Sequence, residues 1–381
     1  MTVERRTRLL IVDDSAVMRS ILRAVISSDR SLEVAGTAAD GASAIQAIET
    51  LRPDLVLLDV EMPVMDGLAT LRELRARGHQ SPVIMCSSVT QRGARVTIEA
   101  LAAGASDYVA KPVGQSDREA GIRMLAQELI PKVKALTRDL TAEPAPGLRP
   151  RVGGAIAPAS PAASAYGSAV EFVPKVVVIG VSTGGPAALD RVLPVLPRSY
   201  PLPVLVVQHM PEIFTGLLAE RLNGRCQLEV REATDGDAVA PGIIFVARGN
   251  WHMEVLAGAS SGAAPTLRLM QSPPVNHCRP AVDILFRTAA AVYGGAVVAA
   301  ILTGMGSDGL AGCRLLRAAG STVLAQDQAT STVWGMPGVV ANAGLANRVL
   351  PLDAIGPEIV RLASAGPGRN RVLAYPQETV A

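Results

Sequence analysis

The sequence predicts an α/β protein made of two doubly wound units joined by a linker, and three observations support this. Apolar, strand-like runs alternate with amphipathic stretches from the first residues onward. The alternation stops over residues 141–173 and resumes at Lys175. The length of 381 residues also exceeds what one hydrophobic core usually serves.

The first unit, predicted over residues 1–140, contains five strand and helix pairs. Its apolar runs are RLLIV, EVAGT, LVLLD, PVIMCS and DYVAK. Amphipathic stretches begin near residues 16, 41, 68 and 92, and a last one runs to about residue 137. Such alternation is typical of a five-stranded parallel sheet with helices on both faces.

A linker, a second unit and a tail are predicted after it. Residues 141–173 are rich in Pro, Ala, Gly and Ser and lack an amphipathic period, which indicates a flexible linker. Residues 174–365 resume the alternation with KVVVIG, PVLVVQ, GIIFVA, AVVAAILT and TVLAQ, and the pair HMEVL and TLRLM inserts as a hairpin. Helices are expected near residues 188, 217, 282 and 315, and residues 366–381 form the tail.

Composition excludes several function classes. The net charge of +2 favours neither nucleic acid nor a membrane surface, and 3% aromatic residues leave little for base stacking. The four cysteines have no C-x-x-C spacing, which argues against a zinc site or a disulfide framework. No signal peptide and no run of about 18 apolar residues is present, so we expect a soluble cytoplasmic protein without membrane insertion.

Charged or hydroxyl side chains follow several strands of the first unit. Asp13 and Asp14 follow the first strand, Asp59 the third, Ser87 the fourth and Lys111 the fifth. Parallel strands bring their carboxyl ends to one edge, where three carboxylates would repel each other unless a cation such as Mg²⁺ lay among them. Taken singly, each aspartate is more readily explained as a helix or turn cap, and the lysine as a solvated charge, so it is the joint pattern that points to a site.

The first unit resembles the receiver domain of response regulators. The stretches VDDS, LLDVEMPVMDG, MCSS and YVAKP of this sequence stand where that family has its motifs. The resemblance implies a flavodoxin-like fold in which Asp59 accepts a phosphoryl group. It also implies Mg²⁺ binding by Asp14, Asp59 and the backbone carbonyl of Glu61, a water-mediated role for Asp13, phosphoryl contacts by Ser87 and Lys111, and a switch role for Tyr108.

A serine between glycines opens the second unit, in the segment Gly180–Gly184. This G-x-S-x-G pattern after a strand is typical of an exposed nucleophile, although a helix cap or a phosphate-binding turn has the same composition. His209 follows PVLVVQ and Asp308 follows AVVAAILT, so both are expected at the same sheet edge as Ser182. The three residue types form a hydrolytic triad when they meet.

Other pairings are open to the sequence. His252 or His277 can replace His209 as the base, and the order seen in α/β-hydrolases would pair His277 with Asp235 or Asp237. Those two aspartates lie in a polar turn with no strand end beneath them, which makes that arrangement the weaker one.

The second unit resembles the catalytic domain of the CheB family of protein-glutamate methylesterases, through IGVSTGGP, VVQHMP, FVARGNWHMEV, PPVNHCRPAVD, ILTGMGSDG and WGMP. The resemblance implies Ser182 as nucleophile, His209 as general base and acid and Asp308 as the orienting acid, with no cofactor for the esterase chemistry. Thr183 and Met305 match positions that contact the oxyanion or substrate. The segments GNW and NHCRP depart from the family pattern, which bears on substrate preference.

The implied activity is hydrolysis of glutamyl methyl esters, and deamidation of glutamines, on chemoreceptors in bacterial chemotaxis. A chemotaxis histidine kinase would supply the phosphoryl group, and we expect the unphosphorylated receiver to pack over the active site. Three rivals compete with this hypothesis: a DNA-binding output domain, a nucleotide site at residues 180–185, and an inactive esterase that acts as a docking protein. The second unit shows no basic recognition helix and no G-x-G-x-x-G.

Overall fold

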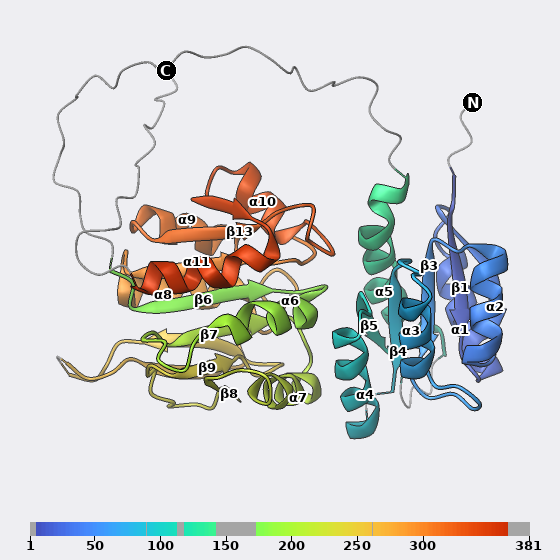
Figure 1. Cartoon of the computed structure of the whole chain (residues 1–381), viewed down its shortest axis with the longest axis horizontal. Coiled ribbons are helices and arrows are strands. Elements are labelled where there is room, and N and C mark those ends of the chain that lie inside the picture. Colours follow the sequence, from blue (N-terminus) through green and yellow to red (C-terminus); the bar gives the residue numbers. More distant parts are fainter. Residues whose placement is uncertain (1–4, 89, 113–117, 142–172, 261, 365–381) are drawn as a thin grey trace, which may run out of the picture.

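The computed structural model describes residues 5–88, 90–112, 118–141, 173–260 and 262–364. Two α/β units lie side by side in it (Figure 1). Apart from Thr141 and Val173, the predicted linker lies outside the described residues, and so does the predicted tail.

The first unit is the five-stranded parallel sheet that the sequence predicts, and its strands lie in the order β2-β1-β3-β4-β5. Its strands are β1 (Thr7–Val12), β2 (Leu32–Ala38), β3 (Leu55–Asp59), β4 (Val83–Ser87) and β5 (Asp107–Ala110). Its helices are α1 (Ala16–Ser27), α2 (Gly41–Leu51), α3 (Gly67–Ala76), α4 (Gln91–Ala102) and α5 (Arg118–Thr141).

Both faces of this sheet are covered, because α1 and α5 pack on one face and α2, α3 and α4 on the other. Every residue of β3 and β4 is buried, which accounts for their uninterrupted apolar runs. Side-chain caps set where the helices begin: Ser15 accepts a hydrogen bond from Met18 N, and Asp40 accepts one from Ser43 N.

The second unit is a seven-stranded parallel sheet in the order β14-β13-β12-β6-β7-β9-β8. Its strands are β6 (Val176–Val181), β7 (Val204–Gln208), β8 (Glu229–Glu232), β9 (Ile243–Val246), β12 (Val297–Ile301), β13 (Thr322–Gln326) and β14 (Arg348–Leu350). The predicted hairpin is the antiparallel pair β10 (His252–Leu256) and β11 (Thr266–Met270).

Helices cover both faces of the second sheet. One face packs against α6 (Gly185–Val192), α7 (Glu212–Asn223) and α11 (Leu352–Ser364). The other face packs against α8 (Val282–Tyr293), α9 (Leu310–Ala318), α10 (Met336–Asn342) and the hairpin. A short 3₁₀ turn, Leu193–Val195, follows α6.

Four elements of the structure are not predicted from the sequence: β8, β14, α10 and α11. Strand β8 has the sequence EVRE, and β14 has only three residues. Both are edge strands of the sheet, with a neighbouring strand on one side only, so they can carry polar residues. Helices α10 and α11 contain Pro337 and Pro357, residues that usually indicate a break.

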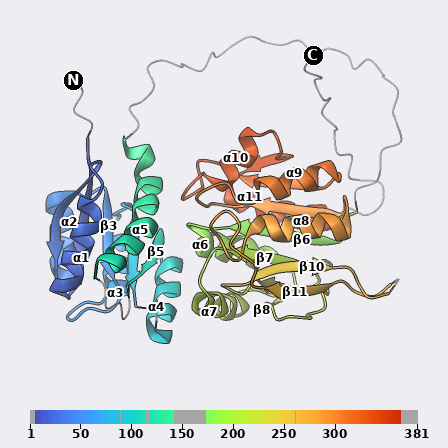
Figure 2. The same ribbon diagram turned by 180° about the vertical axis from the view of Figure 1, so that it is seen from behind.

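The two units meet through α4, β5 and α5 of the first and α6 and α7 of the second, as Figures 1 and 2 agree. The Tyr108 ring lies 4.5 Å, centroid to centroid, from the Phe214 ring on α7. At the rim, Arg95 of α4 pairs with Glu220 of α7 at 3.1 Å. Among the described helices, none has both the length and the apolar character that a bilayer span requires.

Candidate functional site

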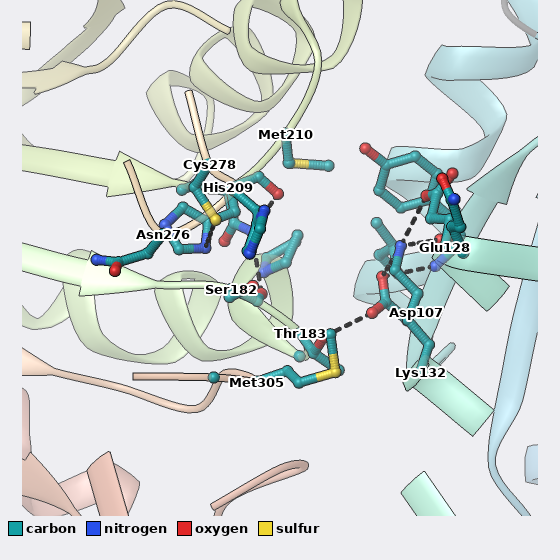
Figure 3. A pocket seen from close by; sticks show the side chains of 18 residues that line it. Asp107, Glu128, Lys132, Ser182, Thr183, His209, Met210, Asn276, Cys278 and Met305 are labelled. Atoms are coloured by element: carbon teal, nitrogen blue, oxygen red, sulfur yellow. Dashed lines mark hydrogen bonds and ion pairs between the residues drawn. The ribbon is translucent and has the colours of Figure 1, made fainter. Parts of the chain in front are cut away.

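A pocket of about 430 Å³ lies between the two units and holds the serine predicted as nucleophile. The second unit contributes Ser182, His209, Cys278 and Met305, and the first contributes residues of β5 and α5 (Figure 3). The pocket is therefore formed by both units.

Three neighbouring strands bring the predicted triad residues to one edge. Ser182 directly follows β6, the strand at the centre of the order β12-β6-β7, and His209 directly follows β7. Backbone hydrogen bonds continue beyond the strands, from Ser182 N to Thr303 O at 3.0 Å and from His209 N to Val181 O at 3.2 Å. Asp308 lies in the segment after β12, so all three come from adjacent carboxyl ends.

The turn that carries Ser182 is tight, but the residue with left-handed backbone is Gly184 (φ 78°) at the start of α6, and not the serine. A Cβ atom on Gly304 would lie 2.8 Å from the Ser182 Cβ, closer than real contacts allow. The glycines thus allow the β12 segment to approach the serine closely. This differs from a nucleophile elbow, in which the serine itself is strained.

Asp308 is held by a dense set of donors. It accepts hydrogen bonds from His209 Nε2 at 2.8 Å, Asn276 Nδ2 at 2.9 Å and the backbone N of Val282 at 2.6 Å. Val282 begins α8, so the carboxylate lies at the positive end of a helix. Burial opposes ionisation, yet these hydrogen bonds lower the pKa of Asp308 below its ordinary value.

The His209 ring contacts a partner through each nitrogen. Nε2 faces Asp308, and Nδ1 lies 3.5 Å from the Sγ atom of Cys278. Burial alone would lower the pKa of His209, but its hydrogen bonds to Asp308 and Cys278 raise that pKa to about 9. Among the described residues, no hydrogen bond joins Ser182 Oγ to this ring, so this conformation links His209 with Asp308 but not with Ser182.

Two polar residues that the sequence reasoning did not single out support this arrangement. Gln208 Nε2 donates to the Ser182 carbonyl at 3.0 Å, which fixes the backbone of the turn. Asn276 bridges Asp308 and Asp283 through its amide nitrogen. Gln208 belongs to the motif VVQHMP and Asn276 to the motif PPVNHCRPAVD, so membership in these motifs is the sequence signal that could have identified them.

Thr183 and Met305, predicted to contact the oxyanion or substrate, both line the pocket. The Thr183 hydroxyl donates to Asp107 Oδ2 at 2.6 Å across the boundary between the units (Figure 3). Asp107 in turn lies 3.5 Å from Lys132 Nζ, and this ammonium group also donates a hydrogen bond to the Tyr108 carbonyl at 2.6 Å. The side chain next to Ser182 is thus bonded to the first unit.

The alternative bases and acids are placed elsewhere or held by other partners. His252 is buried, accepts from Ala281 N at 3.2 Å, and has its pKa lowered by burial. Asp237 pairs with Arg231 at 2.9 Å, and Asp235 accepts from the backbone of the hairpin. His277 lines the pocket with an exposed side chain and has no aspartate partner among the described residues.

The predicted acidic pocket of the first unit is assembled at its own carboxyl edge. Lys111 Nζ lies 2.8 Å from Asp13 Oδ2 and 2.7 Å from Asp59 Oδ1. Carboxylate oxygens of Asp13, Asp14 and Asp59 lie within 4.8 Å of one another. Burial raises the pKa of Asp59. Three carboxylates against one ammonium leave excess negative charge among oxygen donors, a donor set that suits Mg²⁺.

The other residues predicted for this pocket surround it. Glu61 N donates to Asp59 Oδ1 at 3.4 Å, which places the Glu61 backbone beside the carboxylate. The Ser87 hydroxyl accepts from Thr97 Oγ1 at 2.7 Å. Tyr108 is buried against Phe214 and so lies at the boundary between the two units.

Comparisons with known proteins follow the same division. The family model of the CheB methylesterase matches residues 177–359, and that of the response regulator receiver domain matches residues 9–123. A protein-glutamate methylesterase/protein-glutamine glutaminase of Nocardioides sp. is 48% identical over 93% of this chain and 94% of its own length. One of the same name from Trichodesmium erythraeum is 44% identical over 93% and 98%. The solved catalytic domain of the Thermotoga maritima CheB methylesterase is 42% identical, covers 50% of this chain and all of its own, and has a TM-score of 0.48.

Proposed function

This chain belongs to the protein-glutamate methylesterase/protein-glutamine glutaminase family, and from that premise we propose how its residues hydrolyse glutamyl methyl esters on chemoreceptors. It is a hydrolase with a receiver domain, which fits control by phosphorylation in chemotaxis. The observation that supports the proposed site best is the bond of 2.8 Å between His209 and Asp308, at strand ends adjacent to that of Ser182.

Ser182 Oγ attacks the ester carbonyl, and His209 takes the serine proton. Because Nε2 faces Asp308, Nδ1 is the ring nitrogen that accepts this proton, which requires the Cys278 thiol to give way. The imidazolium then gives the proton to the leaving methoxide, so methanol departs and an acyl-enzyme is left. Water attacks the acyl-enzyme with His209 again as base, which releases the glutamate and restores the serine. With a glutamine, ammonia leaves in place of methanol.

Negative charge that develops on the carbonyl oxygen needs donors that are already in place. Thr183 and Met305 both line the pocket that holds Ser182, and their backbone N–H groups are the proposed donors. Each such donor typically contributes about 10²–10³ in rate. No metal or cofactor takes part in this step as proposed.

The receiver covers the pocket in this conformation, and we assign it an inhibitory role. Its residue Asp107 holds the Thr183 hydroxyl, and Tyr108 packs on Phe214 of α7. Transfer of a phosphoryl group from a histidine kinase to Asp59 adds charge that Ser87 and Lys111 can meet only by moving. Movement at β4 and β5 would loosen the Tyr108 and Asp107 contacts and open the pocket.

A Mg²⁺ ion, when bound, supplies positive charge beside the phosphoryl acceptor. Asp14, Asp59 and the backbone carbonyl of Glu61 are the residues proposed to hold it, with Asp13 acting through water. The partners that follow are a chemotaxis histidine kinase and the cytoplasmic part of methyl-accepting chemoreceptors.

Methanol release from methylated receptor membranes tests the proposal with the full chain. Wild type is expected to release methanol faster in the presence of a small-molecule phosphodonor, and Ser182→Ala is expected to release none above background in either condition. Ser364→Ala, an exposed serine at the end of α11, is the matched control and should behave as wild type. Undiminished release by Ser182→Ala would overturn the assignment of the nucleophile.

A further inference from the structure

Cys278 differs from the other three cysteines in its surroundings. Cys86 and Cys313 are buried in the cores, where desolvation raises the pKa of each thiol. Cys226 is half-buried behind α7, and burial raises its pKa to about 11. Cys278 lines the pocket, with its Sγ 3.5 Å from Nδ1 of His209.

A tight turn holds Cys278 in this position. Val275 and Cys278 exchange two backbone hydrogen bonds, of 3.1 and 2.9 Å. The two residues between them, Asn276 and His277, both adopt left-handed backbone, with φ of 51° and 63°. Such a two-residue turn has a defined direction, and consecutive left-handed residues other than glycine are uncommon. The backbone of Cys278 is therefore fixed beside the His209 ring, and rotation of the side chain is enough to move the thiol toward or away from Nδ1.

The geometry around His209 suits a metal ligand. Tetrahedral Zn²⁺ with bonds to a sulfur and an imidazole nitrogen places these two atoms about 3.6 Å apart. The Sγ–Nδ1 distance here is 3.5 Å. Asp308 accepts the other ring N–H, at 2.8 Å from Nε2, which is the carboxylate–histidine arrangement that orients metal-bound imidazoles. Ligand atoms of all three residues lie within 4.8 Å of one another.

We propose that Cys278 and His209 form a reversible Zn²⁺ site at the esterase centre, with Cys278 Sγ and His209 Nδ1 as ligands. Asp308 orients the imidazole, and water fills the remaining positions on the metal. Solvent reaches the pocket, because His277, one of the residues that line it, is exposed. Metal binding displaces the proton of the Cys278 thiol and the proton on His209 Nδ1, and both protons pass to solvent. The sulfur and nitrogen donors select Zn²⁺, whereas the oxygen donors of Asp13, Asp14 and Asp59 suit Mg²⁺.

This site would inhibit ester hydrolysis, a consequence that rests on the proposed function. Nδ1 is the ring nitrogen available to take the Ser182 proton, because Nε2 is engaged by Asp308. A metal on Nδ1 removes the base without altering the serine. Binding of the metal itself does not depend on the esterase assignment, so the two can be tested separately.

The binding test uses the full chain, reduced and freed of metal, in saturating Mg²⁺, with Co²⁺ as a spectroscopic probe and Zn²⁺ as competitor. Wild type is expected to show a thiolate-to-cobalt charge-transfer band that Zn²⁺ abolishes. Cys278→Ser should lack the band and bind Zn²⁺ roughly tenfold or more weakly. Cys226→Ser, the matched control, should retain both. Absence of the band in wild type, or its persistence in Cys278→Ser, overturns the proposal.

A second measurement needs no variant and so does not depend on the folding of Cys278→Ser. Wild type is alkylated with and without Zn²⁺, and the labelled cysteines are mapped by mass spectrometry. Zn²⁺ is expected to protect Cys278 from alkylation and to leave the labelling of Cys226 unchanged; alkylation of Cys278 in the presence of Zn²⁺ contradicts the site.

The third measurement is of activity. Zn²⁺ should suppress methanol release by wild type, and a chelator should restore it. Inhibition of Cys278→Ser should need roughly tenfold more metal. Hydrolysis that proceeds without any Zn²⁺ effect leaves the esterase intact and overturns the inference.

Discussion

Two buried aspartates at two sheet edges show how surroundings decide chemistry. Asp59 and Asp308 both follow apolar parallel strands, and each is almost fully buried, at 3% and 2% exposure. Burial raises the pKa of Asp59, whose neighbours include the carboxylate of Asp13 and one lysine. The pKa of Asp308 is lowered, because it accepts from His209, Asn276 and the start of α8.

The comparison shows that the carboxyl ends of parallel strands can form two kinds of site. At the first edge the carboxylates carry excess negative charge. Binding of a cation and phosphorylation each change this charge, so the site can act as a switch. At the second, hydrogen bonds satisfy the carboxylate fully, so it can orient a histidine without titrating near neutral pH. The boundary between the units then connects the switch to the hydrolytic site through Tyr108 and Asp107.

The largest effect is expected from Asp308→Asn. This change removes the charge that holds the His209 ring, and the loss in kcat should be about 10⁴-fold, as for acids in other triads. Asp353→Asn, an exposed aspartate of α11, is the control and should keep wild-type kcat. Methanol release under phosphodonor measures both. A loss below tenfold would mean that Asp308 is not the orienting acid.

The pH profile gives the next largest effect. With the pKa of His209 raised from 6.5 to about 9, the ring is protonated at pH 7 and cannot accept the Ser182 proton. Basal activity of the unphosphorylated chain should therefore rise about tenfold per pH unit from pH 7 and level off near 9. A raised histidine pKa also stabilises the fold below pH 6.5, and this contribution is lost as the pH rises through 9. A flat profile would break the assignment of His209 as base.

Asp107→Asn tests the connection between the two edges. The charge-assisted bond to the Thr183 hydroxyl becomes a neutral one, which weakens the closed state by about 1 kcal/mol. Ester hydrolysis without a phosphodonor is expected to increase about fivefold, while the phosphorylated rate stays the same. Asp54→Asn, at an aspartate that precedes β3 and pairs with Arg5 and with the backbone N of Arg8 inside the receiver, should leave the ratio of the two rates unaltered. An unchanged basal rate in Asp107→Asn would remove this contact from the proposed control.

The smallest effect concerns stability and compares the two aspartates directly. Without divalent cations, Asp59→Asn is expected to raise the free energy of unfolding, because burial disfavours the ionised carboxylate there. Asp308→Asn should lower it by about 1–3 kcal/mol, because its donors lose a charged acceptor. For Asp59 the stabilisation belongs to low pH and fades as pH rises; for Asp308 it is present above pH 3.8 and is lost as pH falls. Urea unfolding at two pH values checks the opposite signs.

The sequence by itself determined the two sheets and which residues reach their carboxyl ends. Apolar runs such as VLVVQ and VVAAI are local signals for buried strands. In a parallel sheet the carboxyl ends of all strands lie at the same edge. Ser182, His209 and Asp308 could therefore be placed together without coordinates, as could Asp13, Asp59 and Lys111. Edge strands such as β8 and β14 carry no comparable signal, because their half-exposed positions tolerate polar residues.

Only the tertiary structure decided which side chains outside those strand ends meet them. Cys278 lies 69 positions from His209, and Asp107 lies 76 from Thr183. The spacing of a motif can reveal only metal ligands that are close together in the sequence. The four cysteines are far apart in the sequence, and for that reason they argued against a zinc site. Contacts between distant segments depend on how turns are directed and how the two units pack, and these follow from the summed packing of many residues, not from any local pattern.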